Sequence, residues 1–303
     1  MPTRRDVLLS GAALAALGAA RPHGAPQAAA PRPAVAEPWF RISLAEWSLH
    51  RALRDKRLEH LDFSGAAREY GFDGCEYVST FFMDEATHFG YLRELAARAA
   101  DAGVQSLLIM IDGEGELGAA DDEARRRAVE NHHKWIAAAA FLGCHSIRVN
   151  AGGDGPRAEH AARASDSLHR LGEYSDRYGI HVIVENHGGP SSDGAWLAGV
   201  IRAAAHPRVG TLPDFGNFTV GDGVVYDRYR GVEELLPFAR AVSAKSYDFD
   251  AAGNETTIDY ARMLGLVHAA GYRRWLGIEY EGERLSEPDG IRATKALLER
   301  LRG

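Results

Sequence analysis

The stretch Val182-Ile183-Val184-Glu185-Asn186-His187-Gly188-Gly189 contains three β-branched residues, then polar residues, then two glycines. β-Branched residues favour strands, and a short continuous apolar run is typical of a strand buried on both faces. Two comparable runs lead into Asp214 and Glu279. This pattern predicts buried parallel strands with a polar residue at the carboxyl end.

Eight such runs alternate with stretches of helical character from Phe40 onward. The predicted strands are 41–47, 74–78, 106–111, 146–150, 181–185, 209–214, 241–247 and 275–280. The predicted helices are 62–70, 85–103, 121–143, 157–179, 194–206, 231–239, 256–271 and 287–302. Eight strand–helix units with right-handed crossovers predict an α/β fold, a single-domain (β/α)8 TIM barrel. A doubly wound sheet is the alternative, but the sequence has no glycine-rich phosphate turn after its first strand.

The composition is that of an ordinary globular enzyme, since 46% of the 303 residues are apolar and 25% are charged. The formal net charge of −7 becomes −10 without residues 1–36, which hold four arginines and one acid. A nucleic-acid partner is not expected, because phosphate binding needs a basic surface. Cys75 and Cys144 lie in apolar, strand-like contexts and are predicted to be buried free thiols.

Residues 1–36 differ from the rest of the chain. The segment Thr3-Arg4-Arg5-Asp6-Val7-Leu8-Leu9 leads into a run of small apolar residues that ends at Ala20, and a Pro/Ala-rich stretch follows. This order predicts an export signal and a linker, and the paired arginines resemble a twin-arginine signal. We therefore expect a signal and linker over 1–36, a barrel over 37–303, passage through the twin-arginine translocase and a periplasmic location. The alternatives are an uncleaved membrane anchor and an N-terminus that resembles a signal by chance.

Three carboxylates, Glu185, Asp214 and Glu279, come at the ends of apolar strands. A lone charge there is costly to desolvate, so each needs a partner. The carboxyl ends of barrel strands meet at one mouth, and we therefore expect the three side chains to converge. Ion pairs with neighbouring arginines are one explanation. A shared divalent metal is the preferred one, and oxygen ligands indicate Mn²⁺ or Mg²⁺.

The strand-end motifs also carry a resemblance to a known family. They are Val184-Glu185-Asn186-His187, Asp214-Phe215-Gly216-Asn217, Ala244-Lys245-Ser246-Tyr247-Asp248-Phe249 and Ile278-Glu279-Tyr280-Glu281-Gly282. In this order they resemble the xylose-isomerase-like sugar phosphate isomerase/epimerase superfamily, from about Phe40 to the end. The resemblance implies one divalent metal held by Glu, Asp, His and Glu on strands five to eight. By this resemblance Glu185, Asp214 and Glu279 are the first, second and fourth of these metal ligands. It also implies that the two glutamates are the catalytic acid/base pair.

Two positions depart from the family pattern. Ser243 stands where relatives often have the ligand histidine, and serine is a poor ligand for Mn²⁺. In one interpretation the three carboxylates and water bind the metal, with or without His187. In the other, the ammonium of Lys245, which lies on the same strand face as Ser243, replaces the metal. The metal is preferred. Asn217 stands where many relatives have a histidine that often touches substrate, which leaves the substrate class open.

Further polar residues are candidates for substrate binding. They are His187, Asn217, Lys245, Glu76 and Asn150. Glu281 shares a strand face with Glu279 and is either a second acid at the site or half of a loop ion pair. Trp47 is either a platform for a sugar ring or a core residue. His132 and His133 fall within a predicted helix outside the barrel and are not expected to bind metal.

A cation flanked by two glutamates suits proton abstraction next to a carbonyl. The sequence therefore predicts an exported, metal-dependent sugar isomerase or epimerase that acts on a keto-sugar or cyclitol, without a nucleotide cofactor. One alternative is a lyase or hydrolase that acts on 3-keto-glycosides by β-elimination. Another is a non-catalytic carbohydrate-binding barrel. The last strand lacks a glycine-rich turn or basic cluster for a phosphate, which argues against a phosphorylated substrate.

Overall fold

The structure is a computed structural model, and it describes residues 38–302. The predictions for the export signal and linker, and the domain boundary after residue 36, lie outside the described residues. Within the described part of the chain, no helix is long and apolar enough to cross a membrane.

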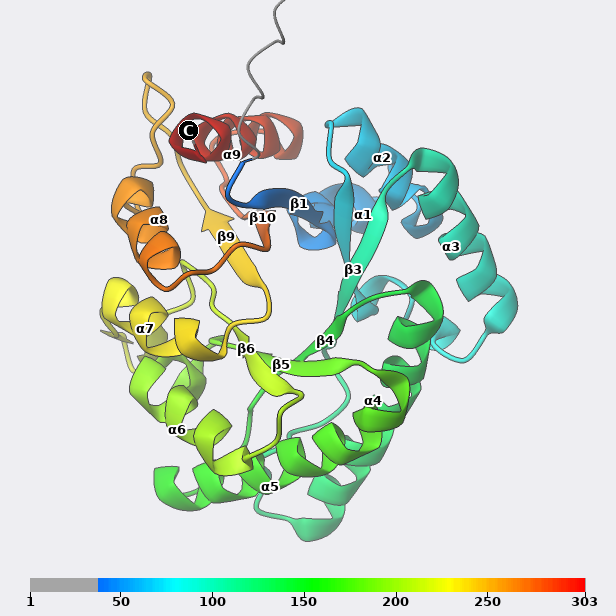
Figure 1. Cartoon of the computed structure of the whole chain (residues 1–303), viewed down its shortest axis with the longest axis vertical. Helices are drawn as coiled ribbons and strands as arrows, with labels where there is room; N and C mark the ends of the chain where they lie inside the picture. Colours follow the sequence, from blue (N-terminus) through cyan, green and yellow to red (C-terminus); the bar gives the residue numbers. More distant parts are fainter. Residues whose placement is uncertain (1–37, 303) are drawn as a thin grey trace, which may run out of the picture. The chain divides into compact units, whose positions relative to one another are not determined.

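One parallel sheet of eight strands forms the centre of the fold (Figure 1). Its strands are β1 (Arg41–Ala45), β2 (Gly74–Val78), β3 (Gln105–Met110), β4 (Ser146–Val149), β5 (His181–Glu185), β6 (Val209–Leu212), β9 (Val242–Ser246) and β10 (Trp275–Tyr280). Their order in the sheet is β6-β5-β4-β3-β2-β1-β10-β9. Parallel bridges Thr211–Ala239 and Asp214–Ser243 join the two edges, and the Ser243 amide donates to the Pro213 carbonyl at 2.9 Å. The predicted single-domain TIM barrel is confirmed.

Eight of the helices follow barrel strands and lie outside the ring of strands (Figure 1). They are α2 (Phe63–Glu69), α3 (Phe89–Ala102), α4 (Asp122–Leu142), α5 (Arg157–Ser175), α6 (Gly194–Ala204), α7 (Arg228–Leu235), α8 (Tyr260–Ala269) and α9 (Glu287–Arg302). Each one corresponds to a predicted helix, with boundaries that differ by a few residues.

Local capping explains several of these boundaries. The Asp121 carboxylate accepts from the Ala124 amide at 2.7 Å at the start of α4, and the helix ends at Gly143 with a φ of 77°. Only glycine adopts such a positive φ without steric cost. The predicted start of α7 at residue 231 is wrong. The helix begins three residues earlier, at Arg228, because the Asp227 carboxylate caps it by accepting from the Arg230 amide at 2.9 Å.

The connecting segments differ most from the predictions. Strand β1 ends at Ala45, and a 3₁₀ turn (Glu46–Leu49) and the short helix α1 (His50–Arg54) follow it. Strand β6 ends at Leu212, because Pro213 has no N–H for the ladder. The hairpin of β7 (Thr219–Gly221) and β8 (Val224–Val225) was not predicted.

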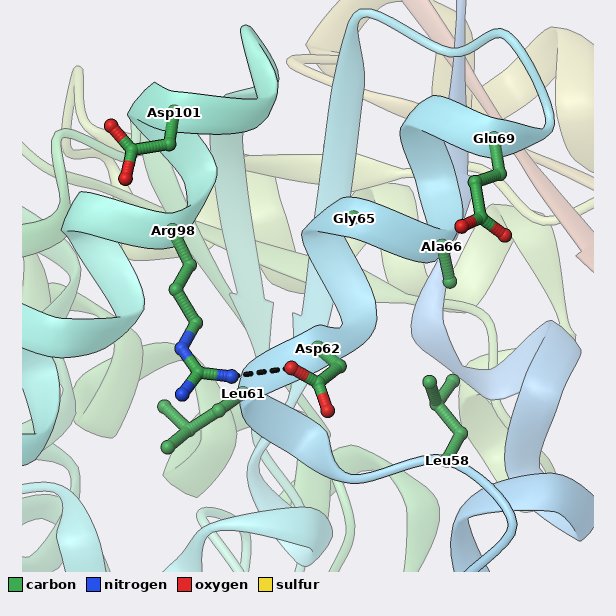
Figure 2. Close-up of a pocket in the computed structure, with 8 residues that line it drawn as sticks. All are labelled: Leu58, Leu61, Asp62, Gly65, Ala66, Glu69, Arg98 and Asp101. Atoms are coloured by element: carbon green, nitrogen blue, oxygen red, sulfur yellow. Dashed lines mark hydrogen bonds and ion pairs between the residues drawn. The ribbon is translucent and has the colours of Figure 1, made fainter.

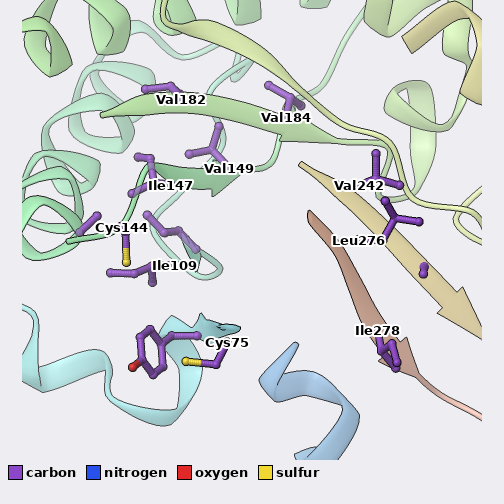
Figure 3. Close-up of a cluster of buried hydrophobic side chains, with 14 of the residues drawn as sticks. Cys75, Ile109, Cys144, Ile147, Val149, Val182, Val184, Val242, Leu276 and Ile278 are labelled. Atoms are coloured by element: carbon purple, nitrogen blue, oxygen red, sulfur yellow. The ribbon is translucent and has the colours of Figure 1, made fainter. Parts of the chain in front are cut away.

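Most of the apolar core lies between the sheet and the helices. Figure 3 shows side chains of this layer, among them Cys75, Ile109, Cys144, Val182 and Val184. Both cysteines are buried and free, as predicted. A smaller apolar cluster fills part of the barrel interior, formed by Ala45, Val78, Leu108, Met110, Ile183, Leu212 and Ala241. Several of the remaining inward positions carry polar side chains, and these make up the candidate site.

The contact between α6 and α7 gives a test of the packing. A β-carbon at Gly194 would lie 2.6 Å from the Gly231 Cα, whereas one at Gly199 on the same helix would meet nothing within 4 Å. Gly194→Ala should lower the free energy of unfolding by about 1–3 kcal/mol through overpacking. Gly199→Ala should raise it by about 0.4–1 kcal/mol by restricting the unfolded chain. Urea denaturation measures both, and equal effects of the two substitutions would contradict the close helix contact.

Candidate active site

The strand register brings three carboxylates together at the carboxyl end of the barrel. Glu185 ends β5, Asp214 follows β6, and Glu279 lies in β10. Ser243 on β9 pairs with Asp214 on one side and with Gly277 of β10 on the other. Positions two residues apart on a strand share a face, so Glu279 lies on the same inward face of β10 as Gly277. All three carboxylates are buried, and each offers an oxygen within 4.8 Å of the others.

Asp214 is held by hydrogen bonds from its own turn. Its Oδ1 accepts from the amides of Gly216 at 2.7 Å and Asn217 at 2.8 Å, and its Oδ2 accepts from the Ser243 hydroxyl at 2.6 Å. Burial raises the pKa of Asp214 to about 7, although the Lys245 ammonium opposes this shift. The carboxyl is therefore rigidly placed and short of positive charge.

Two asparagines connect the ends of β5 and β6. The Asn186 amide donates to the carbonyls of Asp214 at 3.0 Å and Asn217 at 3.1 Å, and its oxygen accepts from the Asp214 amide at 2.8 Å. The side chain of Asn217 donates to Glu185 Oε1 at 3.2 Å. Asn217 thus supports a site carboxylate, and its contact with substrate stays a prediction.

Glu185 faces an arginine that the sequence analysis missed. Arg148 on β4 is buried, and its Nε lies 2.9 Å from Glu185 Oε2 in an ion pair without hydrogen-bond alignment. Its Nη1 donates to Asp112 Oδ1 at 2.8 Å, and Asn150 donates to the same oxygen at 2.8 Å. Burial raises the pKa of Glu185 to about 7, although Arg148 lowers it.

A signal for Arg148 was present in the sequence. It stands between Ile147 and Val149 in a predicted strand, two residues before Asn150 and therefore on the same face. Asp112, also missed, directly follows the third predicted strand, at the position where the other site residues were sought.

The second cation of the site is Lys245. Its ammonium donates to Glu279 Oε1 at 2.8 Å and to Glu281 Oε2 at 2.9 Å. Burial would lower the pKa of Lys245, but the surrounding carboxylates raise it well above its ordinary value. Burial would likewise raise the pKa of Glu279, but the attraction of Lys245 outweighs it and lowers that pKa. Lys245 and Glu279 therefore form a fully charged pair.

The other residues that the sequence predicted for the site differ in how deeply they are buried in the barrel. Glu76 is buried within the barrel, where it accepts from the Ser43 hydroxyl at 2.6 Å. His187 is exposed beyond the end of β5 and is not part of the carboxylate cluster. The Trp47 indole donates to Glu281, which places it beside the site. Substrate contacts by these residues remain predictions.

Two histidines lie outside the barrel, as expected. The ring of His132 on α4 is buried and contacts the Ala128 carbonyl at 2.7 Å, while His133 stacks on Tyr174 at 3.6 Å between ring centroids. A surface pocket between α2 and α3 is also separate from the carboxylates (Figure 2). The ion pair of Arg98 with Asp62 crosses that pocket.

The carboxylate cluster fits a divalent cation in its donor chemistry. Its oxygens are the ligands that Mn²⁺ and Mg²⁺ accept. Burial raises the pKa values of Glu185 and Asp214 to about 7 although Arg148 and Lys245 oppose these shifts, and a further bound cation would favour the charged form of both carboxyls. Glu185, Asp214 and Glu279 are the residues that could hold the ion. Ser243 offers a hydroxyl where a histidine would offer a neutral ring nitrogen, and it is therefore not counted among the ligands.

Residues 65–302 match the family described as xylose isomerase-like TIM barrel, and the chain belongs to this family. A comparison with curated protein sequences gave no match. Among solved structures, 3-keto-D-glucoside 4-epimerase from E. coli is similar with a TM-score of 0.67 and 16% identity, over 87% of this chain and all of that one. An L-ribulose 3-epimerase gives a TM-score of 0.67 and 17% identity, over 87% of this chain and 94% of that one.

A sugar phosphate isomerase/epimerase from Parabacteroides distasonis is also similar, with a TM-score of 0.68 and 15% identity. The match covers 90% of this chain and 97% of that one. At these identities the likeness shows a shared fold.

The burial of Glu76 predicts a pH-dependent stability. Burial raises its pKa from 4.5 to about 7, which means that the folded protein holds a proton that the unfolded chain releases. Stability should therefore fall as the pH rises between these two values and change no further above them. Glu76→Gln has no such titration, and its stability relative to wild type should rise across this window.

Urea denaturation in the presence of EDTA, at about pH 5 and about pH 8, measures this difference. Glu123→Gln is the control, because Glu123 lies on the exposed surface of α4. A relative stability of Glu76→Gln that is the same at both pH values would contradict a protonated buried carboxyl.

Proposed function

We propose that this protein is a divalent-metal-dependent sugar epimerase or isomerase that acts on an unphosphorylated keto-sugar or cyclitol. The observation that carries this proposal is the convergence of Glu185, Asp214 and Glu279, with oxygens within 4.8 Å of one another at the end of the barrel where such enzymes place their chemistry. Membership of the xylose isomerase-like family and the epimerases among the structural neighbours support the same reaction class.

The three carboxylates would hold Mn²⁺ or Mg²⁺, which supplies a Lewis acid for a carbonyl or enediolate oxygen when bound. Glu185 and Glu279 are the acid/base pair for the proton next to that carbonyl. The pKa values of the two carboxyls are shifted in opposite directions, because burial raises that of Glu185 to about 7 whereas burial is outweighed by the attraction of Lys245 at Glu279 and that pKa is lowered. Such a divergence is typical of a general acid and a general base that work together.

The neighbouring residues orient this pair. Arg148 and Asn217 contact the two oxygens of Glu185, and Ser243 and Lys245 contact the two oxygens of Glu279. Positions held in this way allow one carboxyl to remove a proton and the other to return one on the opposite face. Trp47 and Asp112 come after the carboxyl ends of β1 and β3 and are half-buried, so a sugar ring and its hydroxyl groups bound at this end of the barrel would meet them.

A 3-keto-glycoside is the second candidate substrate, with β-elimination in place of epimerisation. The neighbour named 3-keto-D-glucoside 4-epimerase favours the substrate class, and its name does not bear on elimination. Both reactions begin with the same proton abstraction and differ in whether the glycosidic bond then breaks.

Deuterium exchange tests the proton abstraction that both reactions share. Purified protein supplied with Mn²⁺ should exchange the proton next to the carbonyl of a keto-sugar in D₂O. Glu185→Gln and Glu279→Gln should each slow the exchange by about 10²–10⁴-fold, because general acid–base catalysis contributes that much. The control Glu283→Gln, an exposed residue close to the site, should exchange at the wild-type rate.

The products decide between the two reactions. An epimerised sugar supports the epimerase, and release of a free aglycone from a 3-keto-glycoside supports elimination. Exchange that persists in Glu279→Gln would overturn the assignment of the acid/base pair.

We also propose that the protein is exported to the periplasm by the twin-arginine translocase. The arginine pair at residues 4 and 5, followed by a short apolar run, supports this route. Replacing both arginines by lysine should retain the protein in the cytoplasm. Cell fractionation measures this, and unchanged export of the variant would contradict the route.

A further inference from the structure

Lys245 occupies an unusual place beside the proposed metal site. It lies on β9 opposite Glu279 of β10 and shares the inward face with Ser243. Its ammonium is buried and contacts Glu279 Oε1 at 2.8 Å and Glu281 Oε2 at 2.9 Å. A permanent positive charge thus lies directly on a carboxylate that the proposed metal also needs.

The carboxylate of Glu279 is already engaged by the ammonium. Lys245 donates to Oε1, whereas the hydroxyl of Ser243 lies 3.2 Å from Oε2 and donates its one proton to Asp214 at 2.6 Å. A cation bound by Glu279 therefore shares this carboxylate with the ammonium or displaces the ammonium from it. In a buried site two positive charges on one carboxylate repel strongly, because little solvent screens them.

Glu281 offers the ammonium a second partner. Its side chain is 28% exposed, compared with 6% for Glu279, and it accepts the Trp47 indole N–H as well as the ammonium. Glu281 is therefore fixed in place by a residue that is independent of the proposed metal ligands. The ammonium can keep this ion pair when Glu279 turns to another cation.

We propose that the Lys245 ammonium competes with the divalent cation for Glu279, and that Glu281 retains the ammonium when the cation binds. This inference rests on the proposed metal dependence of the site. It identifies Lys245 and Glu281 as positioning residues that set the affinity of the site for metal, in a chain that has serine where relatives often carry a histidine ligand.

Mn²⁺ titration followed by the electron paramagnetic resonance signal of the free ion tests the competition without any substrate. Lys245→Met removes the competing charge and should tighten Mn²⁺ binding by about tenfold, within the usual range for coupled binding events. Glu281→Gln leaves Glu279 as the only carboxylate on the ammonium and should weaken binding by about tenfold. The controls Lys56→Met and Glu283→Gln change the same charges at exposed positions and should bind like wild type.

The double variant Lys245→Met/Glu281→Gln isolates the role of Glu281. If Glu281 acts by holding the ammonium, its substitution should have little effect once Lys245 is gone. An equal loss of affinity in both backgrounds would show a simple charge effect on the metal and overturn that role. Circular dichroism of each variant checks folding, and if Lys245→Met does not fold, binding by Glu281→Gln equal to that of Glu283→Gln overturns the proposal.

The other outcomes of the Mn²⁺ titration each support or overturn the competition. Wild-type binding that Lys245→Met does not tighten overturns the competition and leaves the proposed metal dependence standing. Binding by Lys245→Met without measurable binding by wild type supports the competition in its strongest form. Absence of binding in every variant overturns both this inference and the metal-dependent function.

Discussion

The desolvation of three carboxylates is the constraint on which the structure of the site depends. Glu185, Asp214 and Glu279 are removed from water by the barrel wall, and an isolated buried charge costs several kcal/mol even after the protein relaxes. Each carboxylate therefore has a partner on an adjacent strand or turn. Arg148 forms an ion pair with Glu185, and Lys245 forms one with Glu279. Asp214 accepts hydrogen bonds from backbone amides and from the Ser243 hydroxyl.

This requirement divides the barrel into two regions. The layer between sheet and helices is apolar and provides the burial that stabilises the fold. The interior combines a small apolar cluster with polar residues that would be unfavourable elsewhere, including Glu76 and its Ser43 partner. Preorganised charges in such a place act strongly on a bound substrate, because no solvent has to reorganise around them.

Strands were the most predictable elements, because a buried parallel strand is a continuous apolar run with clear ends. Strands β2, β5 and β10 match the predicted residues. The short helix α1 was missed, because its start depends on a distant residue. The amides of Arg51 and Ala52 donate to the carboxylate of Glu287, at 2.6 Å and 3.1 Å, from the first turn of α9. A contact over such a separation leaves no local signal.

The sequence by itself determined the eight-fold strand–helix order, the strand ends that carry Glu185, Asp214 and Glu279, and the buried state of both cysteines. These follow from local apolar periodicity, which the chain displays along its length. Only the tertiary structure decided which groups lie beside these acids. Arg148 and Lys245 reach their carboxylates because the strand register places β4 beside β5 and β9 beside β10. The direction of each long side chain is then set by the charge it must neutralise, which no stretch of sequence specifies alone.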